Sequence, residues 1–302
     1  MKNYYKILIA VMLIAVTSIG FTDFNDQDFS KISLKKIKIT DSIYMLQGVN
    51  GFAGGNLAVS IGEDGTLMVD DQLSPMNEKI IAALDGMQGS KPKFVLNTHW
   101  HGDHTGGNAI FGKDATIIAH HNVRKRVSTD QHGHFGKTPA SPKQAWPVIT
   151  FDDSLSIHFN GEEIRFLHYP NGHTDGDGVV YFVGSNVVHM GDLLFTDVFP
   201  FIDLDTGGNV FNYAENLQAI MEWLPKDVKI IPGHGELTDI EGIEKTHNMM
   251  LETSMYVMEK VSQGNTLEQI QAEGLPEEWK SWGNGFVNEE FWISLIINSH
   301  EP

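Results

Sequence analysis

The hydrophobic residues of this chain fall into short runs separated by polar turns, a pattern typical of strands joined by loops and helices. In the first half of the chain, strands are expected at residues 43–49, 57–61, 66–70, 93–97 and 115–119. In the second half, they are expected at residues 154–159, 163–168, 178–183, 186–190 and 228–231. Each half starts with strands and ends with helical patterns, and no linker divides them. The chain therefore predicts one domain in which two sheets face each other and helices cover the outside.

Helical periodicity appears between and after these runs. One helix is expected to begin near residue 74 and to place Ile80, Ile81 and Leu84 on a single face. Further helices are expected at residues 122–128 and 211–224, and from about residue 239 onward. Residues 131–147 are polar and contain glycine and proline, so a long surface loop is expected there.

The first residues differ from the rest of the chain. Lys2 and Lys6 precede an apolar run at residues 7–16, and the small residues Ser18 and Gly20 follow it. A basic start, a short apolar segment and small residues are typical of a secretory signal peptide. The alternative is an uncleaved membrane anchor, but the run is shorter than the roughly 20 residues that a spanning helix needs.

The expected organisation is a signal peptide at residues 1–20, an N-terminal lead-in at 21–37 and a single domain at 38–302. Such a protein would be exported to the periplasm or the extracellular space. After removal of the signal peptide, it would keep no stable membrane anchor.

The composition limits the partners and the chemistry that are compatible with the chain. A formal net charge of −18 disfavours binding to nucleic acid, because the phosphates would be repelled. The absence of cysteine excludes disulfides, thiolate metal ligands and cysteine nucleophiles. The 14 histidines are then the main source of metal-binding and proton-transfer groups.

The most specific motif directly follows the expected strand at residues 93–97. His99, His101, Asp103 and His104 lie within six positions and are followed by glycines. Clustered ionisable groups at a strand end usually mark a functional site, and imidazole with carboxylate suits zinc. Since His99 and His101 are two residues apart, both can face one ion. Asp103 and His104 would then point elsewhere, which favours a second ion.

Three later residues supply further ligands. His173, Asp192 and His234 each stand beside a glycine near the end of an expected strand. Each would be a weak signal alone, because histidines in turns are often only solvated. Their coincidence with the first cluster favours a metal site.

These residues give the chain a resemblance to the metallo-β-lactamase-fold hydrolase superfamily, whose signature is His-x-His-x-Asp-His followed by a distant histidine, an aspartate and a last histidine. The resemblance covers about residues 38–250. It implies an α+β fold, a four-layer αββα sandwich of two mixed β-sheets flanked by helices. It also implies two zinc ions, although iron or manganese would suit the same ligands. By position, His99, His101 and His173 would hold one ion, Asp103, His104 and His234 the other, and Asp192 would bridge the two.

The resemblance also assigns a supporting residue. Asp70, at the end of the expected strand 66–70, matches the superfamily's first conserved aspartate and would orient a histidine. Asp71 is the neighbouring alternative, and a turn or capping role is the simpler interpretation of either residue. The aspartate at position 192 is similar to that of lactonases and glyoxalase-II-type thioesterases, since β-lactamases of this fold place cysteine or serine there.

The implied function is hydrolysis of an ester, lactone or amide bond, with a β-lactam-like ring among the candidates. A hydroxide that bridges the metal ions would attack, and Asp103 and Asp192 are the expected catalytic carboxylates. The alternatives are a glyoxalase-II-like thioesterase and a zinc-binding protein without catalysis.

The residues that contact substrate are less clear from the sequence. Phe52, Trp100 and Phe195 lie near the motifs and are candidates for the pocket, although burial in the core is the alternative for each ring. A small-molecule substrate that bears a carboxylate would suit the locally positive metal site. His132 and His134 are interpreted as solvated residues of the rim, and His189 as a residue packed within its sheet.

Overall fold

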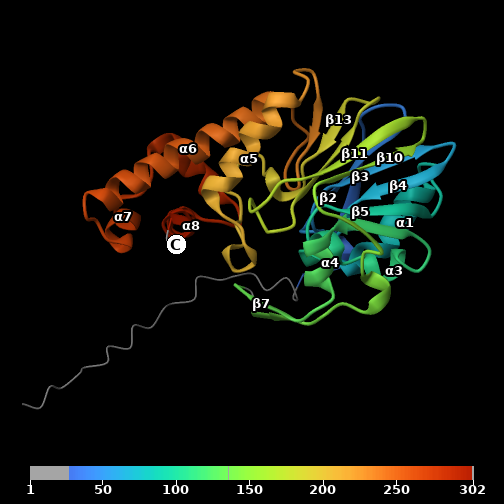
Figure 1. Cartoon of the computed structure of the whole chain (residues 1–302), viewed down its shortest axis with the longest axis horizontal. Helices are drawn as coiled ribbons and strands as arrows, with labels where there is room; N and C mark the ends of the chain where they lie inside the picture. Colours follow the sequence, from blue (N-terminus) through green and yellow to red (C-terminus); the bar gives the residue numbers. More distant parts are fainter. Residues whose placement is uncertain (1–26, 135, 301–302) are drawn as a thin grey trace, which may run out of the picture.

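The computed structural model describes residues 27–134 and 136–300. Two β-sheets face each other, and helices cover both outer surfaces (Figure 1). The expected signal peptide, residues 1–20, lies outside the described residues. Within the described part of the chain, no helix combines the length and the hydropathy needed to cross a membrane.

The first sheet contains seven strands in the order β1-β2-β3-β4-β5-β6-β9. These strands are β1 (Ser33–Lys38), β2 (Ile43–Val49), β3 (Leu57–Gly62), β4 (Gly65–Val69), β5 (Pro92–Asn97), β6 (Thr116–His120) and β9 (Ile149–Phe151). Strands β1 to β4 pair antiparallel, whereas β4, β5, β6 and β9 pair in parallel. The sheet is therefore mixed. Short turns connect its antiparallel strands, and longer crossover connections join its parallel strands.

The second sheet contains five strands in the order β10-β11-β12-β13-β14. They are β10 (Ser154–Phe159), β11 (Glu162–His168), β12 (Gly178–Phe182), β13 (Val187–His189) and β14 (Lys229–Ile231). Only β13 and β14 are parallel; the other neighbours are antiparallel. A separate hairpin is formed by β7 (Gln131–Gly133) and β8 (Gly136–Thr138).

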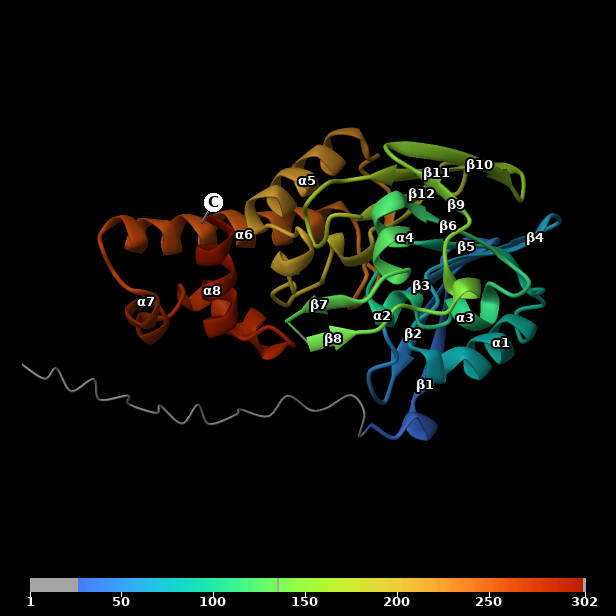
Figure 2. The same cartoon turned by 60° about the horizontal axis from the view of Figure 1, so that its bottom comes forward.

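The α-helices are α1 (Asn77–Asp85), α2 (Gly102–Thr105), α3 (Asn108–Phe111), α4 (His121–Val127), α5 (Val210–Trp223), α6 (Ile240–Ser262), α7 (Leu267–Glu273) and α8 (Glu289–His300). Short 3-10 helices are η2 (Phe29–Lys31), η3 (Ser74–Met76), η4 (Lys143–Ala145), η5 (Gly191–Leu193), η6 (Leu204–Thr206) and η7 (Glu277–Asn284). Helices α6, α7, η7 and α8 form what we call the C-terminal lobe, which extends to one side of the two sheets (Figures 1 and 2).

Alternating residues along the strands explain the layers. In β4, Leu67 and Val69 face the second sheet and share a central core with Phe166. Met68 faces the other way and packs with Ile80 of α1. Because successive side chains of a strand point to opposite faces, a strand with a hydrophobic residue at every position needs a partner on both faces. The expected αββα sandwich of two mixed sheets is confirmed.

Three details differ from the sequence-based expectations. Strand β1 (Ser33–Lys38) pairs with β2, so the sheet begins within the expected lead-in, 21–37. The lysines of this edge strand gave it the composition of a polar segment. The expected loop at 131–147 contains the β7–β8 hairpin and η4. The side chain of Ile81 is 41% exposed, because it lies about 100° around the helix from its buried neighbour Ile80.

Candidate metal centre

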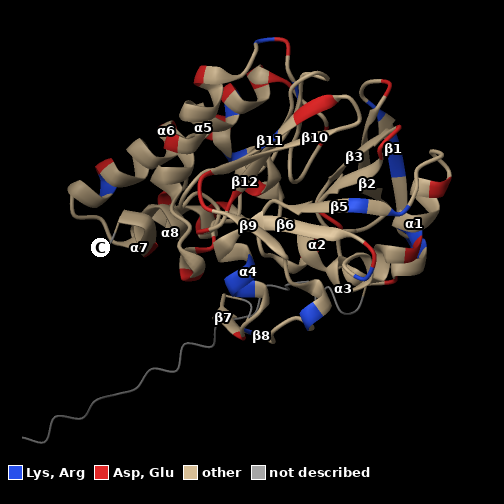
Figure 3. Cartoon of the chain, turned by 45° about the vertical axis from the view of Figure 1, so that its right-hand side comes forward, with Lys and Arg blue, Asp and Glu red and all other residues tan. Residues whose placement is uncertain are grey.

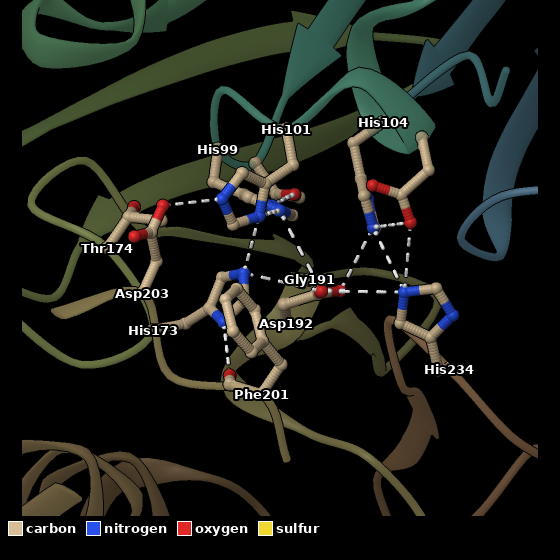
Figure 4. A network of polar contacts seen from close by, with 12 residues as sticks. His99, His101, His104, His173, Thr174, Gly191, Asp192, Phe201, Asp203 and His234 are labelled. Carbon is tan, nitrogen blue, oxygen red and sulfur yellow. Dashed lines mark hydrogen bonds and ion pairs between the residues drawn. The ribbon is translucent and has the colours of Figure 1, made fainter. Parts of the chain in front are cut away.

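Seven potential ligands from distant parts of the chain converge at one edge of the sandwich (Figure 4). We call His99, His101 and His173 the first group, and Asp103, His104 and His234 the second group. The structure brings together all seven residues that the sequence selected, and within each group the ligand atoms lie within 4.8 Å of one another; Asp192 is counted with the first group.

The elements that carry these residues end at the same edge. The loop after β5 carries His99 and His101, and α2, which follows it directly, carries Asp103 and His104. The remaining ligands come from the second sheet: His173 lies between β11 and β12, Asp192 in η5 after β13, and His234 after β14. Strand ends from both sheets therefore supply the site.

Asp192 lies between the two groups (Figure 4). Its Oδ1 atom is 3.0 Å from Nε2 of His104. Its Oδ2 atom is 3.4 Å from Nε2 of His173 and also 3.4 Å from Nε2 of His234. One carboxylate thus contacts ligands of both groups, which is the geometry that a bridging residue needs.

The outer contacts of the first group fix which nitrogen of each ring carries the proton. Nδ1–H of His173 donates to the carbonyl oxygen of Phe201 at 2.7 Å. Nε2–H of His101 donates to Oδ2 of Asp203 at 2.9 Å. A neutral imidazole has one N–H, so the inner nitrogens of these rings present lone pairs. These inner nitrogens, Nε2 of His173 and Nδ1 of His101, lie 2.9 Å apart.

Asp70 fixes the rings of His99 and His104. Its carboxylate accepts hydrogen bonds from Nδ1 of His104 and from the backbone N–H and hydroxyl of Thr98, each at 2.8 Å. Because the Thr98 hydroxyl gives its proton to Asp70, its oxygen accepts from Nδ1–H of His99 at 3.1 Å. In the neutral form of each ring, the inner Nε2 atom therefore presents a lone pair as well. Asp71, the alternative to Asp70, accepts instead from the backbone N–H of Gly107 at 2.8 Å.

The arrangement fits metal ions. In their neutral forms, neighbouring rings would present lone pairs to each other at 2.9 to 3.3 Å, which is repulsive unless a proton or a metal ion lies among them. Tetrahedral zinc with Zn–N bonds of about 2.0–2.1 Å places two ligand nitrogens about 3.3 Å apart. In addition, Oδ1 of Asp192 is buried and accepts no hydrogen bond. A cation would satisfy both the lone pairs and this oxygen.

The pKa values of His99 and His173 are shifted in the opposite direction to those of His104 and His234. In the first group, burial lowers the pKa of His99 well below its usual range and that of His173 to about 4. In the second group, burial also favours the neutral form, but the carboxylates of Asp192 and Asp103 outweigh it. They raise the pKa of His104 well above its usual range and that of His234 to about 9.

The two carboxylates are ionised at neutral pH. Burial alone would raise the pKa of Asp192 and Asp103, but the positive charge on His104 is the main influence that reverses it. The pKa of each carboxyl therefore lies well below its usual range. Ionised carboxylates and neutral imidazoles are the forms that coordinate metals.

Two glycines leave room for the ligands. A Cβ atom at Gly55 would lie 2.1 Å from the ring of His104, and one at Gly233 would lie 2.1 Å from Oδ1 of Asp192. Real Cβ atoms do not approach other atoms so closely, so a side chain at either position would displace a ligand.

The centre opens to solvent on the side of the second group. The side chains of Asp103 and His234 are each 20% exposed, whereas that of His173 is 1% exposed. The rings of Phe52 and Phe195, two of the expected pocket residues, stack on His234 at 5.7 and 4.9 Å between centroids. Apolar rings therefore flank the open side.

The other aromatic residues named from the sequence lie nearby. The third expected pocket residue, Trp100, has its ring 4.8 Å from that of His101, and its Nε1 donates to Thr206. His132 and His134 are exposed in the β7–β8 hairpin, and neither belongs to a metal-type group of the described residues. His189 is fully buried, as expected.

Sequence reasoning missed three groups that orient the ligands: the carboxylate of Asp203, the carbonyl oxygen of Phe201 and the hydroxyl of Thr98. Asp203 stands beside no glycine and no histidine, and a backbone carbonyl has no sequence signal at all. Only its proximity to the ring of His101 gives Asp203 a role, and proximity between residues a hundred positions apart appears only in the fold.

Comparisons with known proteins agree with this geometry. A family model described as the Metallo-beta-lactamase superfamily matches residues 53–234. The chain is 27% identical over 219 residues to a "Beta-lactamase-like protein 2 homolog" of Drosophila melanogaster, covering 67% of each chain. It is 26% identical over 196 residues to a hydroxyacylglutathione hydrolase of Nitrosococcus oceani, covering 64% of this chain and 66% of that one. The solved structure of a metallo-beta-lactamase from Pontibacter korlensis shares the fold with a TM-score of 0.60 at 17% identity, covering 72% of this chain and 99% of that one.

Proposed function

This chain belongs to the metallo-beta-lactamase superfamily and is a metal-dependent hydrolase, and we propose that it holds two zinc ions and hydrolyses an ester, lactone or amide bond. The observation that carries the proposal is the set of ring nitrogens and carboxylate oxygens directed inward on both sides of Asp192. The first group would hold one ion, the second group the other, and Asp192 would contact both. Iron and manganese remain compatible with the same ligands.

Bound zinc lowers the pKa of water to about 7 and polarises a carbonyl, which is the chemistry that hydrolysis at neutral pH needs. The residues of the chain prepare the site for it. Asp103 is ionised and 20% exposed, so its carboxylate can accept a hydrogen bond from the attacking water and orient it. Asp192, which is buried, keeps the two groups at a fixed separation.

The open side of the site favours a small substrate with an apolar portion. Phe52 and Phe195 both stack on His234, so an apolar group of the substrate would rest on their rings while the scissile bond faces Asp103. Lactones, esters and β-lactam-like rings all meet this description. A carboxylate on the substrate would be attracted by the bound cations themselves.

A thioesterase of the glyoxalase-II type is the second candidate, and the relative from Nitrosococcus oceani supports it. An anionic thiol substrate such as glutathione would need free positive charge near the site, and two lysines there are already paired with acidic residues. Lys35 pairs with Glu236, two residues after His234, and Lys245 pairs with Asp197. Their charges are already neutralised by acidic partners on the protein.

More widely, basic residues gather on β1 and α4 (Figure 3).

A substrate panel tests the proposal and separates these candidates. Protein stripped of metal by a chelator and reloaded with zinc would be assayed in parallel with an acyl-homoserine lactone, a chromogenic cephalosporin and a glutathione thioester. We expect zinc-dependent turnover of the lactone or the cephalosporin. Faster turnover of the thioester would favour the second candidate. Full activity of the stripped protein would contradict both.

We also propose that the protein is exported, on the basis of the pattern at residues 1–20. Mass spectrometry of the protein recovered outside the cytoplasm should show a mature form that lacks about the first 20 residues. Recovery of the full-length form in a membrane fraction would favour an anchor instead.

A further inference from the structure

One irregular segment connects the metal centre to the C-terminal lobe. Residues 199–210, which we call the bridging segment, run from the end of the loop after η5 to the first residue of α5 and include η6. Residues 199–203 belong to no helix or strand, so their position depends on contacts with neighbouring elements.

On its inner side, the bridging segment holds two rings of the first group. The carbonyl oxygen of Phe201 accepts from Nδ1–H of His173 at 2.7 Å, and Asp203 accepts from Nε2–H of His101 at 2.9 Å. The backbone N–H of Asp203 also donates to the carbonyl oxygen of His173 at 2.9 Å. A displacement of this segment would therefore turn or release both rings.

On its outer side, the bridging segment is held by the C-terminal lobe. The ring of Phe199 stacks on Trp292 of α8 with 5.3 Å between centroids and 6° between planes. The backbone N–H of Phe199 donates to the carbonyl oxygen of Trp282 in η7 at 3.1 Å. At the other end, Val210 N–H donates to the hydroxyl of Ser299 at 3.1 Å. The side-chain amide of Asn209, which caps α5, donates to the carbonyl oxygen of Ser299 at 2.8 Å.

Among the described residues, the contacts that orient the second group come from outside η7 and α8. His104 is oriented by Asp70, which directly follows β4, and His234 directly follows the turn after β14. Both supports lie in the sheets, within the residues 53–234 that the family model matches. The residues of η7 and α8 lie outside that range.

We propose that the C-terminal lobe is a positioning element of the first group: η7 and α8 hold the bridging segment where Phe201 and Asp203 orient His173 and His101. The inference rests on the proposed two-ion site. It follows that a change in the lobe that leaves the fold intact weakens the binding of one metal ion and spares the other. Trp292 and Ser299 act through the bridging segment and are positioning residues.

The test compares two tryptophans of the lobe in the full chain loaded with zinc. Trp292→Leu removes the ring that stacks on Phe199, and Trp292→Phe keeps a ring there. Trp279→Leu is the matched control, because Trp279 is also buried in the lobe but contacts Glu252 and Trp282, so that it reaches the bridging segment only through Trp282. Ser299→Ala is a milder variant that removes only the acceptor of the Val210 N–H.

Three measurements are made on each variant. Competition with a chromogenic chelator gives the stoichiometry and affinity of zinc. Nitrogen-15 NMR of the histidine side chains reports the protected N–H groups of His101, His173 and His104. Thermal unfolding of the stripped proteins records any general loss of stability.

We expect Trp292→Leu to weaken one of the two zinc equivalents by about tenfold, at the low end of the effect of losing a direct partner of a ligand. The N–H signals of His101 and His173 should exchange faster, while that of His104 persists. Trp292→Phe should restore both signals. Ser299→Ala and Trp279→Leu should each show a smaller effect than Trp292→Leu.

Two results would overturn the inference: wild-type affinities and signals in both Trp292→Leu and Ser299→Ala, or an equal loss of both zinc equivalents in Trp292→Leu and Trp279→Leu. A wild-type protein that binds fewer than two zinc ions would instead contradict the proposed function on which the inference rests.

Discussion

The first and second groups share the same kinds of ligand, but different parts of the fold hold them. The rings of His101 and His173 are oriented by the bridging segment, whereas His104 is oriented by Asp70 at the end of a strand. In the first group, His99 and His173 are buried, and burial lowers their pKa values so that they favour the neutral form. The second group lies partly open to solvent, and its histidines favour the protonated form before a metal binds.

This difference indicates that the two groups are suited to different roles. A buried, neutral set of imidazoles is already in the form that binds a cation, so the first group is suited to hold an ion tightly. The second group includes the exposed Asp103 and His234, so it is suited to meet water and substrate. Asp192 contacts His173 of the first group and His104 of the second group, so a change at this residue should affect both groups.

The largest effect is expected from removal of the shared ligand. Asp192→Ala should lower activity by roughly 100-fold or more and reduce the zinc content at both groups, because one carboxylate contacts both. The measurement is elemental analysis of the purified variant together with its turnover on the best substrate of the panel. A variant that retains two zinc ions and near wild-type turnover would remove the bridging role.

A smaller effect is expected from Asp70, which orients His104 of the second group directly and His99 of the first group through Thr98. Asp70→Asn should weaken zinc binding by about 10- to 100-fold, because Asn keeps the shape but loses the charge that holds His104. Asp71→Asn is the matched control. Burial raises the pKa of Asp71 well above its usual range, so an amide closely resembles its protonated form.

Zinc affinity measured by chelator competition distinguishes the two variants. A larger loss in Asp71→Asn would show that the neighbouring alternative is the better assignment, and equal losses would contradict a special role for Asp70.

The smallest effect concerns stability away from the metal centre. The ring of His120 stacks on that of His168 with 3.7 Å between centroids, and burial is the main cause that lowers the pKa of His120 to about 4. The unfolded chain binds this proton near pH 6.5, so the free energy of unfolding should fall as the pH drops from about 6.5 to about 4. It should stay flat, as far as His120 is concerned, above that range.

His120→Asn keeps an N-capping side chain for α4 and removes the titrating ring. Its loss of stability over this pH range should be smaller than that of the wild type by about 1–2 kcal/mol. Chemical denaturation at several pH values measures the slope, and His158→Asn, on an exposed position of β10, is the control. Equal slopes in all three proteins would contradict the assignment.

Much of the fold could be predicted from the sequence because most of its strands are hydrophobic runs bounded by turns. The run at 43–49 coincides with β2, and the run at 154–159 coincides with β10. Strand β1 was missed because Lys35, Lys36 and Lys38 give it the composition of a polar segment. Its position at the edge of the sheet, where lysines prevent further pairing, explains that composition.

The candidate site shows a similar limit. All seven potential ligands could be named because histidine and aspartate beside glycine at strand ends are visible in the sequence. The groups that orient them could be named only where a family pattern covers them, as with Asp70. The roles of Asp203 and the Phe201 carbonyl depend on how the bridging segment is held by the lobe, and such long-range contacts leave no local pattern.

The central claim is that seven residues hold two cations with Asp192 between them. The most direct measurement is anomalous X-ray scattering, recorded at the zinc absorption edge, from crystals of the zinc-loaded protein. We predict two peaks, one among His99, His101 and His173 and one among Asp103, His104 and His234, each in contact with a carboxylate oxygen of Asp192. A single peak, or peaks that Asp192 does not contact, would contradict the account.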